Sequence, residues 1–171
     1  SEYMIKVILD RRTVRKYKQE PITDTILEQI LKAGMYAPYA AKEMPFHFIV
    51  IKDSKTLSDL KAIHPFGQPL EKAPVAIVVC ADKKCEPVDG LHVSDCAAAT
   101  ENLMLAAKAF NLGSCWLGLY PWESITKKVK EYFKLPDDIA PFSIITMGYP
   151  NEEEEPRPDR FDKTRIHNEK W

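Results

Sequence analysis

The segment that most constrains the fold is a nearly continuous apolar run in the middle of the chain, APVAIVVCAD, from Ala73 to Asp82. It lacks the alternation of apolar and polar residues that marks a strand with one side in water, so it predicts a strand covered on both faces. A strand of this kind needs a layer of structure on each side of its sheet. The remaining segments therefore have to supply two covering layers.

The other segments alternate between helical and strand patterns. Apolar spacing predicts five helices, over residues 2–10, from the Thr23 cap to Pro38, and over 54–63, 93–110 and 122–133. Runs of β-branched and aromatic residues predict three further strands, at 46–53, 113–120 and 141–149. The alanine-rich segment 93–110 is expected to be a central buried helix. This order favours a three-layer α+β or α/β domain over sandwiches, barrels and bundles.

Composition excludes several classes of protein. The 171 residues suit one domain with a full core, covering 1–171, and the 45% apolar and 29% charged fractions are those of an ordinary globular protein. A net charge of −1 argues against a nucleic-acid partner. No apolar run reaches the roughly 18 residues of a membrane span, and no segment resembles a secretory leader, so we expect a cytoplasmic protein without a membrane partner.

Cysteine and histidine spacing predicts no metal site. The four cysteines form no CxxC pair, and no two histidines stand four residues apart. We expect the cysteines to be reduced and mostly buried, because free cysteine behaves as a small apolar side chain. The cysteines are Cys80, Cys85, Cys96 and Cys115.

A basic segment follows the first predicted helix. Four cations stand within Arg11–Lys16, and none of the six glycines belongs to a phosphate-binding glycine loop. An extended backbone presents Arg11, Thr13 and Arg15 on one face, opposite Arg12, Val14 and Lys16. Guanidinium groups form paired bonds to phosphate, so this segment is either half of an anion site or a solvated basic face.

The C-terminal arm, residues 151–171, carries a second basic group. It contains four consecutive glutamates and two prolines, then Lys163-Thr164-Arg165 and a final Trp171. If both basic groups met on one phosphate, each charge-assisted bond would contribute about 1.5–3 kcal/mol and hold the arm in place. The aromatic tip favours docking onto a neighbour, and the alternative is a free terminus.

Four segments together resemble motifs of the FMN-dependent nitroreductase family, almost from end to end. RRTVRKY resembles its RR(S/T)xR(K/A)(F/Y) opening, and YAPYAAKEMPFHFIVI resembles its (S/A)PSxxNxQPWxF(I/V)VV segment. SDCAAATENLMLAAKAFNLGSCWLG is similar to its D-x-A-A-A-x-x-N-x-x-L-A-A helix and the GxxxxW(I/L)G strand that follows. GYPNEEEEPRPDRFDKTRIHNEKW is similar to the C-terminal arm of the short members.

The resemblance implies a three-layer α+β fold with a central, mostly antiparallel sheet, in a homodimer that exchanges its C-terminal arms. It implies one FMN at each of two interface sites and an enzyme that works by ping-pong kinetics. NADH or NADPH gives hydride to flavin N5, and a nitroaromatic, quinone or similar small acceptor then takes the electrons. No side chain is needed as a general base, so no catalytic residue is expected.

By motif position, the resemblance also implies which residues contact FMN. Arg11 and Thr13, joined by Lys163 and Arg165, would hold the phosphate and ribityl chain, and Arg15 would face the pyrimidine edge. The cation at that edge stabilises the negative charge left by reduction. Gly118 lets the backbone approach the ring. The remaining contacts expected are Arg12, Pro38, Tyr39 and Ala40 (the last three from the other subunit), Lys42, Met44, and Leu117 beside Gly118 near N5. Outside these motifs, the loop residue Gln68 is expected to supply an amide to the pyrimidine ring.

The chain departs from the family pattern around the flavin ring. Lys42 replaces an asparagine, Met44 a glutamine, Phe46 a tryptophan and Tyr39 a serine. Lys42 either adds a second cation near the ring or points into solvent. These changes leave the flavin potential and the shape of the substrate pocket open.

Other polar and aromatic residues have plainer interpretations. Asp95 and Asn102 are expected to bridge to backbone groups instead of taking part in chemistry. Trp116, Tyr120 and Trp122 are expected to pack.

Three alternative functions remain. One is an enone, enal or quinone reductase, or a flavin-dependent dehydrogenase, on the same fold. The second is an FMN-binding protein without turnover. The third is an anion-binding module that uses the basic segment without flavin selectivity.

Overall fold

The computed structural model describes residues 1–171 and contains one sheet of four strands. The strands lie in the order β1-β2-β4-β3, and each neighbouring pair is antiparallel. This arrangement confirms the antiparallel α+β sheet and excludes a parallel α/β one. The strands are β1 (Phe46–Ile51), β2 (Val75–Asp82), β3 (Gly113–Gly118) and β4 (Ile139–Gly148).

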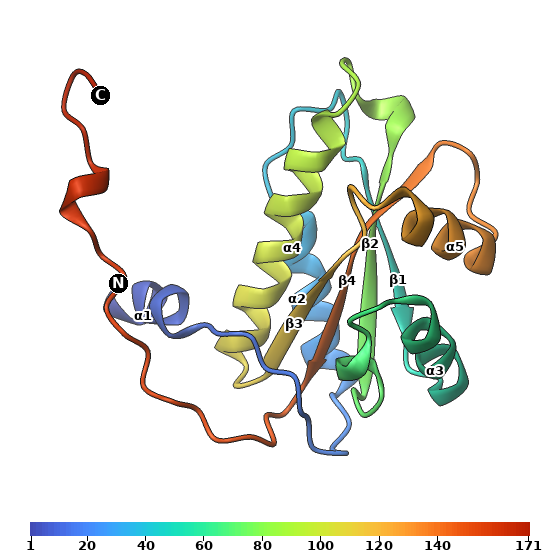
Figure 1. The fold of residues 1–171 in the computed structure, drawn as a ribbon, viewed down its shortest axis with the longest axis horizontal. Coiled ribbons are helices and arrows are strands. Elements are labelled where there is room, and N and C mark those ends of the chain that lie inside the picture. The colour runs from blue at the N-terminus through green and yellow to red at the C-terminus, as the bar shows by residue number, and fades with distance from the viewer.

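Helices cover both faces of the sheet, as the three-layer prediction requires. In Figure 1, α2 and α4 lie on one side of the sheet and α3 and α5 on the other. All five helices begin and end within about three residues of their predicted positions. They are α1 (Glu2–Asp10), α2 (Asp24–Met35), α3 (Ser54–Ile63), α4 (Leu91–Ala109) and α5 (Glu123–Phe133).

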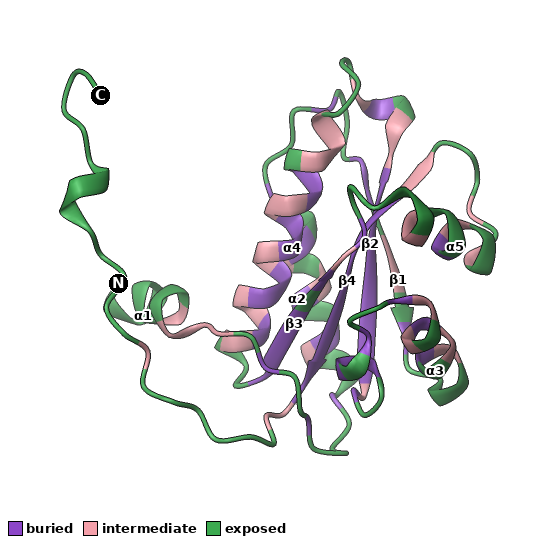
Figure 2. Ribbon diagram, in the orientation of Figure 1, coloured by how far each residue is buried: buried purple, intermediate pink, exposed green.

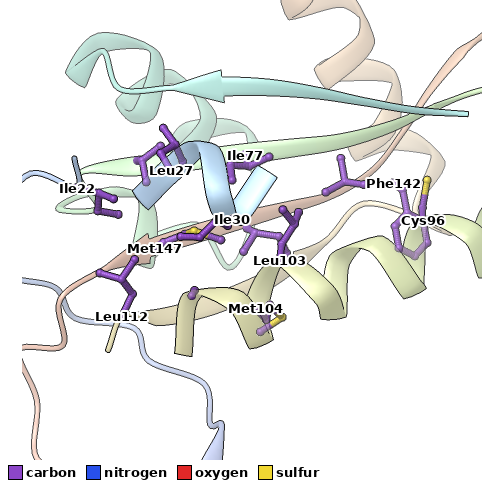
Figure 3. Packing of buried hydrophobic residues seen from close by; sticks show 14 of the residues in the cluster. Ile22, Leu27, Ile30, Ile77, Cys96, Leu103, Met104, Leu112, Phe142 and Met147 are labelled. Atoms are coloured by element: carbon purple, nitrogen blue, oxygen red, sulfur yellow. The ribbon is translucent and has the colours of Figure 1, made fainter. Parts of the chain in front are cut away.

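The strand β2 is covered on both faces, as predicted. Its first seven residues are buried, and successive side chains enter different cores. Ile77 packs with Ile30 of α2 and Leu103 of α4, as Figure 3 shows. In Figure 2 the ribbon of β2 has the purple of buried residues along most of its length. Val78, one residue along, packs with Leu60 of α3 on the opposite face. The middle of the sheet therefore forms a rigid support for the edge strands.

Local capping explains where α2 and α3 begin. The Thr23 side chain accepts the Ile26 N–H, and the Asp53 side chain accepts the Thr56 N–H. Helix α2 ends at Met35, three residues before the proline that was expected to stop it. The chain then turns at Tyr36 toward β1.

The basic segment is extended and lies along the outer edge of β3. Thr13 forms a parallel bridge with Ser114, and the Val14 N–H donates to the Ser114 carbonyl at 2.9 Å. Val14 is buried between the exposed side chains of Thr13 and Arg15, which confirms the predicted alternation at these residues. Lys16 is exposed, and Tyr17 is the next buried residue, so the alternation stops there.

Gly113 allows the close approach of the basic segment to β3. A Cβ atom at residue 113 would lie 2.5 Å from the Val14 Cβ, which is too close for two carbon atoms. We expect Gly113→Ala to lower the free energy of unfolding by about 1–3 kcal/mol, because the buried Val14 has to move. Urea denaturation measures this change. In a Val14→Ala background the same substitution should cost less, and an equal cost in both backgrounds would contradict the clash.

The first helix and the C-terminal arm stand outside the core. No residue of α1 is buried, and residues 158–171 are all exposed. In Figure 1 the arm runs past α1, and its end stands apart from the rest of the chain. None of the helices is long and apolar enough to cross a bilayer.

Candidate active site

A cavity of about 410 Å³ opens at the outer edge of β3. We call it the β3 edge cavity. It lies between β3, the turn before β2 and the start of α5. Its lining includes Arg15, Gln68, Trp116, Leu117, Gly118 and Trp122. Four of the predicted cofactor contacts, Arg15, Gln68, Leu117 and Gly118, are therefore brought together, although they come from three separate parts of the chain.

The strand register determines which backbone groups face this cavity. Residues of an antiparallel strand direct their N–H and C=O groups alternately toward the partner strand and away from it. The Ser114 carbonyl accepts the Val14 N–H on the outer side, while the Leu119 N–H donates to the Phe142 carbonyl of β4. Gly118 is four residues after Ser114, so its backbone groups point the same way as those of Ser114, and it lies opposite Ser143 on β4. Its N–H and C=O groups therefore both point to the outer edge.

Gly118 also has a packing role inside the chain. A Cβ atom there would lie 3.2 Å from Cζ3 of Trp122, so the glycine leaves room for the indole ring. The side chain of Leu117 is buried in the core with α3 and α5. At this end of β3, the groups that reach the cavity are therefore backbone groups.

Arg15 is the cation of the β3 edge cavity, and it lies near the buried thiol of Cys115. Burial raises the pKa of Cys115, and the positive charge of Arg15 opposes this shift only in part. Burial also raises the pKa of Cys80 to about 12. All four cysteines are free and buried, as predicted. The thiol beside the cavity is therefore protonated at neutral pH, which leaves no thiolate nucleophile there.

Aromatic side chains form much of the cavity wall. Trp116 and Trp122 line it, and both are more than a third exposed. Trp116 also packs edge-on against Phe142, with ring centroids 5.8 Å apart, and Tyr120 stacks on the same ring at 6.2 Å. The predicted packing role is thus present for Trp116 and Tyr120. Flat apolar walls with a few polar groups are typical of a site for an aromatic ligand.

The predicted phosphate contacts lie along the same edge but outside the β3 edge cavity. The Arg11 Nε lies 3.1 Å from Glu101 Oε1 on α4. Arg11 and Arg12 line a small space beside Gly113, and Thr13 is exposed next to it. Arg11 and Arg12 are partly exposed, so a phosphate can reach them.

Arg157 joins this group and was not among the predicted contacts. Its Nη1 atom is occluded and has no hydrogen-bond partner. Desolvation lowers its pKa, and repulsion from Arg160, Arg11 and Arg12 adds to the effect. An unpaired guanidinium group beside other cations fits an anion. Arg157 stands between two prolines in a polar arm and belongs to no motif, so the sequence did not identify it.

A single chain does not bring Lys163 and Arg165 to the basic segment. Both lie in an exposed 3₁₀ turn near the end of the arm, where Arg165 pairs with Asp162 at 3.3 Å. In Figure 1 this turn stands apart from β3.

The predicted contacts from Pro38 to Met44 lie in the loop between α2 and β1, and none of them lines the β3 edge cavity. The Ala40 N–H donates to Asp95 Oδ1 at 2.8 Å, and the Lys42 N–H donates to the Cys85 carbonyl at 2.9 Å. All five side chains are exposed: Pro38, Tyr39, Ala40, Lys42 and Met44. This loop is therefore held in a fixed shape with its side chains directed outward.

Asp95 and Asn102 hold backbone groups around α4, as predicted. Asp95 binds the loop at Ala40, and Asn102 donates to the Ala33 carbonyl of α2 at 3.0 Å. Asp95 Oδ2 is buried without a hydrogen-bond partner, so only the other oxygen of this carboxylate forms a hydrogen bond.

His64 also lines the β3 edge cavity and contacts Gly118, a role that no motif indicated. Across the structure, His, Cys, Asp and Glu side chains nowhere gather in a group that would hold a metal ion.

Comparison with known proteins agrees with this geometry. The sequence profile described as "Nitroreductase family" matches residues 8–65 and 65–149. A protein of Archaeoglobus fulgidus named "Putative NADH dehydrogenase/NAD(P)H nitroreductase" is 45% identical, over 99% of both chains. The structure of an FMN-dependent nitroreductase from Clostridium difficile is 30% identical, covers 98% of this chain and 99% of its own, and superposes with a TM-score of 0.90.

A further solved structure, entitled "putative nitroreductase in complex with fmn", comes from Desulfovibrio desulfuricans. It is 28% identical, covers 91% of each chain and superposes with a TM-score of 0.79. The profile match spans most of the chain, and the relatives match it over nearly its whole length. The chain belongs to the nitroreductase family.

Proposed function

We propose that this protein is an FMN-dependent oxidoreductase that takes hydride from NADH or NADPH and passes the electrons to a small organic acceptor. The observation that carries the proposal is the β3 edge cavity. There a cation, Arg15, an amide, Gln68, and the outward N–H of Gly118 meet between aromatic walls. Relatives named as FMN-dependent enzymes and as NAD(P)H nitroreductases support the same cofactors.

The hydrogen-bond donors of the β3 edge cavity fit a flavin ring. An isoalloxazine is flat and apolar on its faces, with hydrogen-bonding atoms along its edges, and the cavity offers the same division of apolar walls and polar edge groups. When bound, FMN would accept hydride at N5 and release two electrons to an acceptor. Gly118 would direct its N–H toward that atom, Gln68 would bind the pyrimidine edge, and Arg15 would stabilise the negative charge that develops there.

The basic segment would hold the other end of the cofactor. Arg11, Arg12 and Thr13 follow the outer side of β3 from Gly113 toward the cavity, so they lie in line with Arg15. Arg157 adds a guanidinium group with an unpaired nitrogen to the same end. A phosphate would replace the repulsion among these cations with charge-assisted hydrogen bonds.

We also propose that two copies of the chain form the complete site. Helix α1 exposes a row of large apolar side chains that nothing in one chain covers: Tyr3, Met4, Ile5, Ile8 and Leu9. The arm exposes Phe161, Ile166 and Trp171. Exposed apolar surface of this extent favours a protein partner. A second copy would cover it, bring Lys163 and Arg165 to the phosphate, and place the loop containing Tyr39 against the flavin.

A panel of electron acceptors tests the reaction. Steady-state turnover is measured with nitroaromatics, quinones and enones, each with NADH and with NADPH. The proposal predicts parallel lines in double-reciprocal plots, because the two substrates use the same cavity in turn. Turnover of enones alone would favour the alternative reductase. Bound FMN that no nicotinamide reduces would favour an FMN-binding protein.

A further inference from the structure

We infer that His64 is a positioning residue, which fixes the orientation of the Gly118 backbone against the bound flavin. The inference rests on the proposed function. It adds a residue from the turn after α3 to a site otherwise built from β3 and the basic segment. The contact that carries it joins the His64 ring to the Gly118 carbonyl, with 2.8 Å between Nε2 and the oxygen.

The hydrogen bonds of His64 determine its tautomer. The Phe66 N–H donates to Nδ1 at 3.0 Å, so Nδ1 carries no proton. The ring proton therefore sits on Nε2, which donates to the Gly118 carbonyl. Both ring nitrogens form hydrogen bonds: Nδ1 only accepts and Nε2 only donates. The ring cannot rotate or change tautomer without losing both bonds.

The backbone around His64 is rigid enough for it to act as an anchor. The side chain is buried, although it lines the cavity. The His64 N–H donates to the Leu60 carbonyl at 3.0 Å, and the Gly67 N–H donates back to the His64 carbonyl at 3.1 Å. A Cβ at Gly67 would lie 2.9 Å from the Lys61 Cα, so the turn is packed directly on α3.

Gly118 needs such an anchor. It is the last residue of an edge strand, and glycine has the least restricted backbone of any residue. The ladder to β4 holds Leu117 opposite Ile144 and binds the Leu119 N–H, but Gly118 directs both of its polar groups outward. The His64 bond fixes its carbonyl. The Leu119 N–H bond holds the other end of the same peptide plane, so the two bonds together restrict the rotation of Gly118 about ψ and favour one direction of its N–H, which we assign to flavin N5.

Two near-isosteric substitutions separate this role from a general effect on stability. The glutamine amide in His64→Gln places an N–H near the position of Nε2, so it can still donate to Gly118. The asparagine amide in His64→Asn places an oxygen near the position of Nδ1, so it can still accept from Phe66 but cannot reach Gly118. Each variant keeps one bond and loses the other. His47→Asn, at an exposed histidine of β1, is the control for losing an imidazole.

The test measures anaerobic reduction of the FMN-loaded protein at saturating NADH, together with the melting temperature of each variant. We expect the limiting rate of His64→Asn to be about tenfold below that of His64→Gln, because a displaced donor slows hydride transfer. The two melting temperatures should be similar. Equal rates in the two variants would overturn the inference.

Two further outcomes are decisive. If His64→Asn does not fold, His64→Gln is compared with the wild type instead. Its limiting rate of flavin reduction must then stay within about tenfold of the wild-type rate. A larger loss at an unchanged melting temperature overturns the inference. If the wild type takes up no FMN, the proposed function fails and the inference fails with it. A wild type that is reduced normally, beside variants of equal rate, defeats the inference about His64 alone.

Discussion

Truncation after Pro158 is expected to abolish both the retention of FMN and the formation of the dimer. The deletion removes Lys163 and Arg165, and two charge-assisted bonds of about 1.5–3 kcal/mol each correspond to a loss of roughly a hundredfold or more in FMN affinity. It also removes the apolar side chains of Phe161, Ile166 and Trp171, which are exposed in the single chain. Fluorescence titration with FMN and light scattering after gel filtration measure the two effects.

A full-length variant separates the two roles of the arm. Lys163→Ala combined with Arg165→Ala should lose FMN affinity but keep the dimer, because the apolar side chains remain. Glu153→Gln combined with Glu155→Gln changes two exposed charges of the same arm and should leave both properties intact. A truncated monomer that binds FMN as tightly as the full chain would contradict the role given to the arm.

Arg15→Ala is expected to lower the midpoint potential of the bound flavin while reducing its affinity much less. Two-electron reduction leaves negative charge on the pyrimidine side of the ring, so a cation there stabilises the reduced form more than the oxidised form. Loss of about 1.5–3 kcal/mol of this stabilisation corresponds to a potential roughly 30–60 mV more negative. Anaerobic titration with a reference dye measures the potential.

Two variants control for other effects of this substitution. Arg15→Lys keeps the charge and should recover most of the potential, although it loses the paired geometry of the guanidinium group. Lys16→Ala removes the neighbouring exposed cation, which does not line the β3 edge cavity, and should leave the potential unchanged. If Arg15→Ala strips the flavin and leaves its potential where it was, Arg15 is a binding residue and its electrostatic role is wrong.

The elements of this fold were predictable because their signals are local. The cap at Asp53 places the start of α3, and the unbroken apolar run of β2 predicts its burial on both faces. Apolar spacing likewise identifies α4 as the buried helix. The alternation of the basic segment holds from Thr13 to Arg15. It ends where the Tyr17 hydroxyl bonds Thr146, a contact with β4 that no local pattern indicates.

The candidate site was predictable mostly where a motif marks it, and Gln68 is the exception. Arg15 and Gly118 follow from the family resemblance, and the structure places both at one cavity. The roles of His64 and Arg157 depend on contacts between segments far apart in the chain, such as the bond from His64 to Gly118. The pairing of Arg11 with Glu101 has the same origin. Long-range contacts of this kind follow from how the layers pack and not from the spacing of residues.

The central claim is that cations from the basic segment and the arm surround one FMN at the β3 edge cavity. The most direct test is the absorbance spectrum of the purified protein, recorded before and after anaerobic addition of NADH or NADPH. A yellow protein with the two visible bands of oxidised flavin, bleached by the nicotinamide, is the predicted result. A colourless protein that takes up no added FMN would contradict the account.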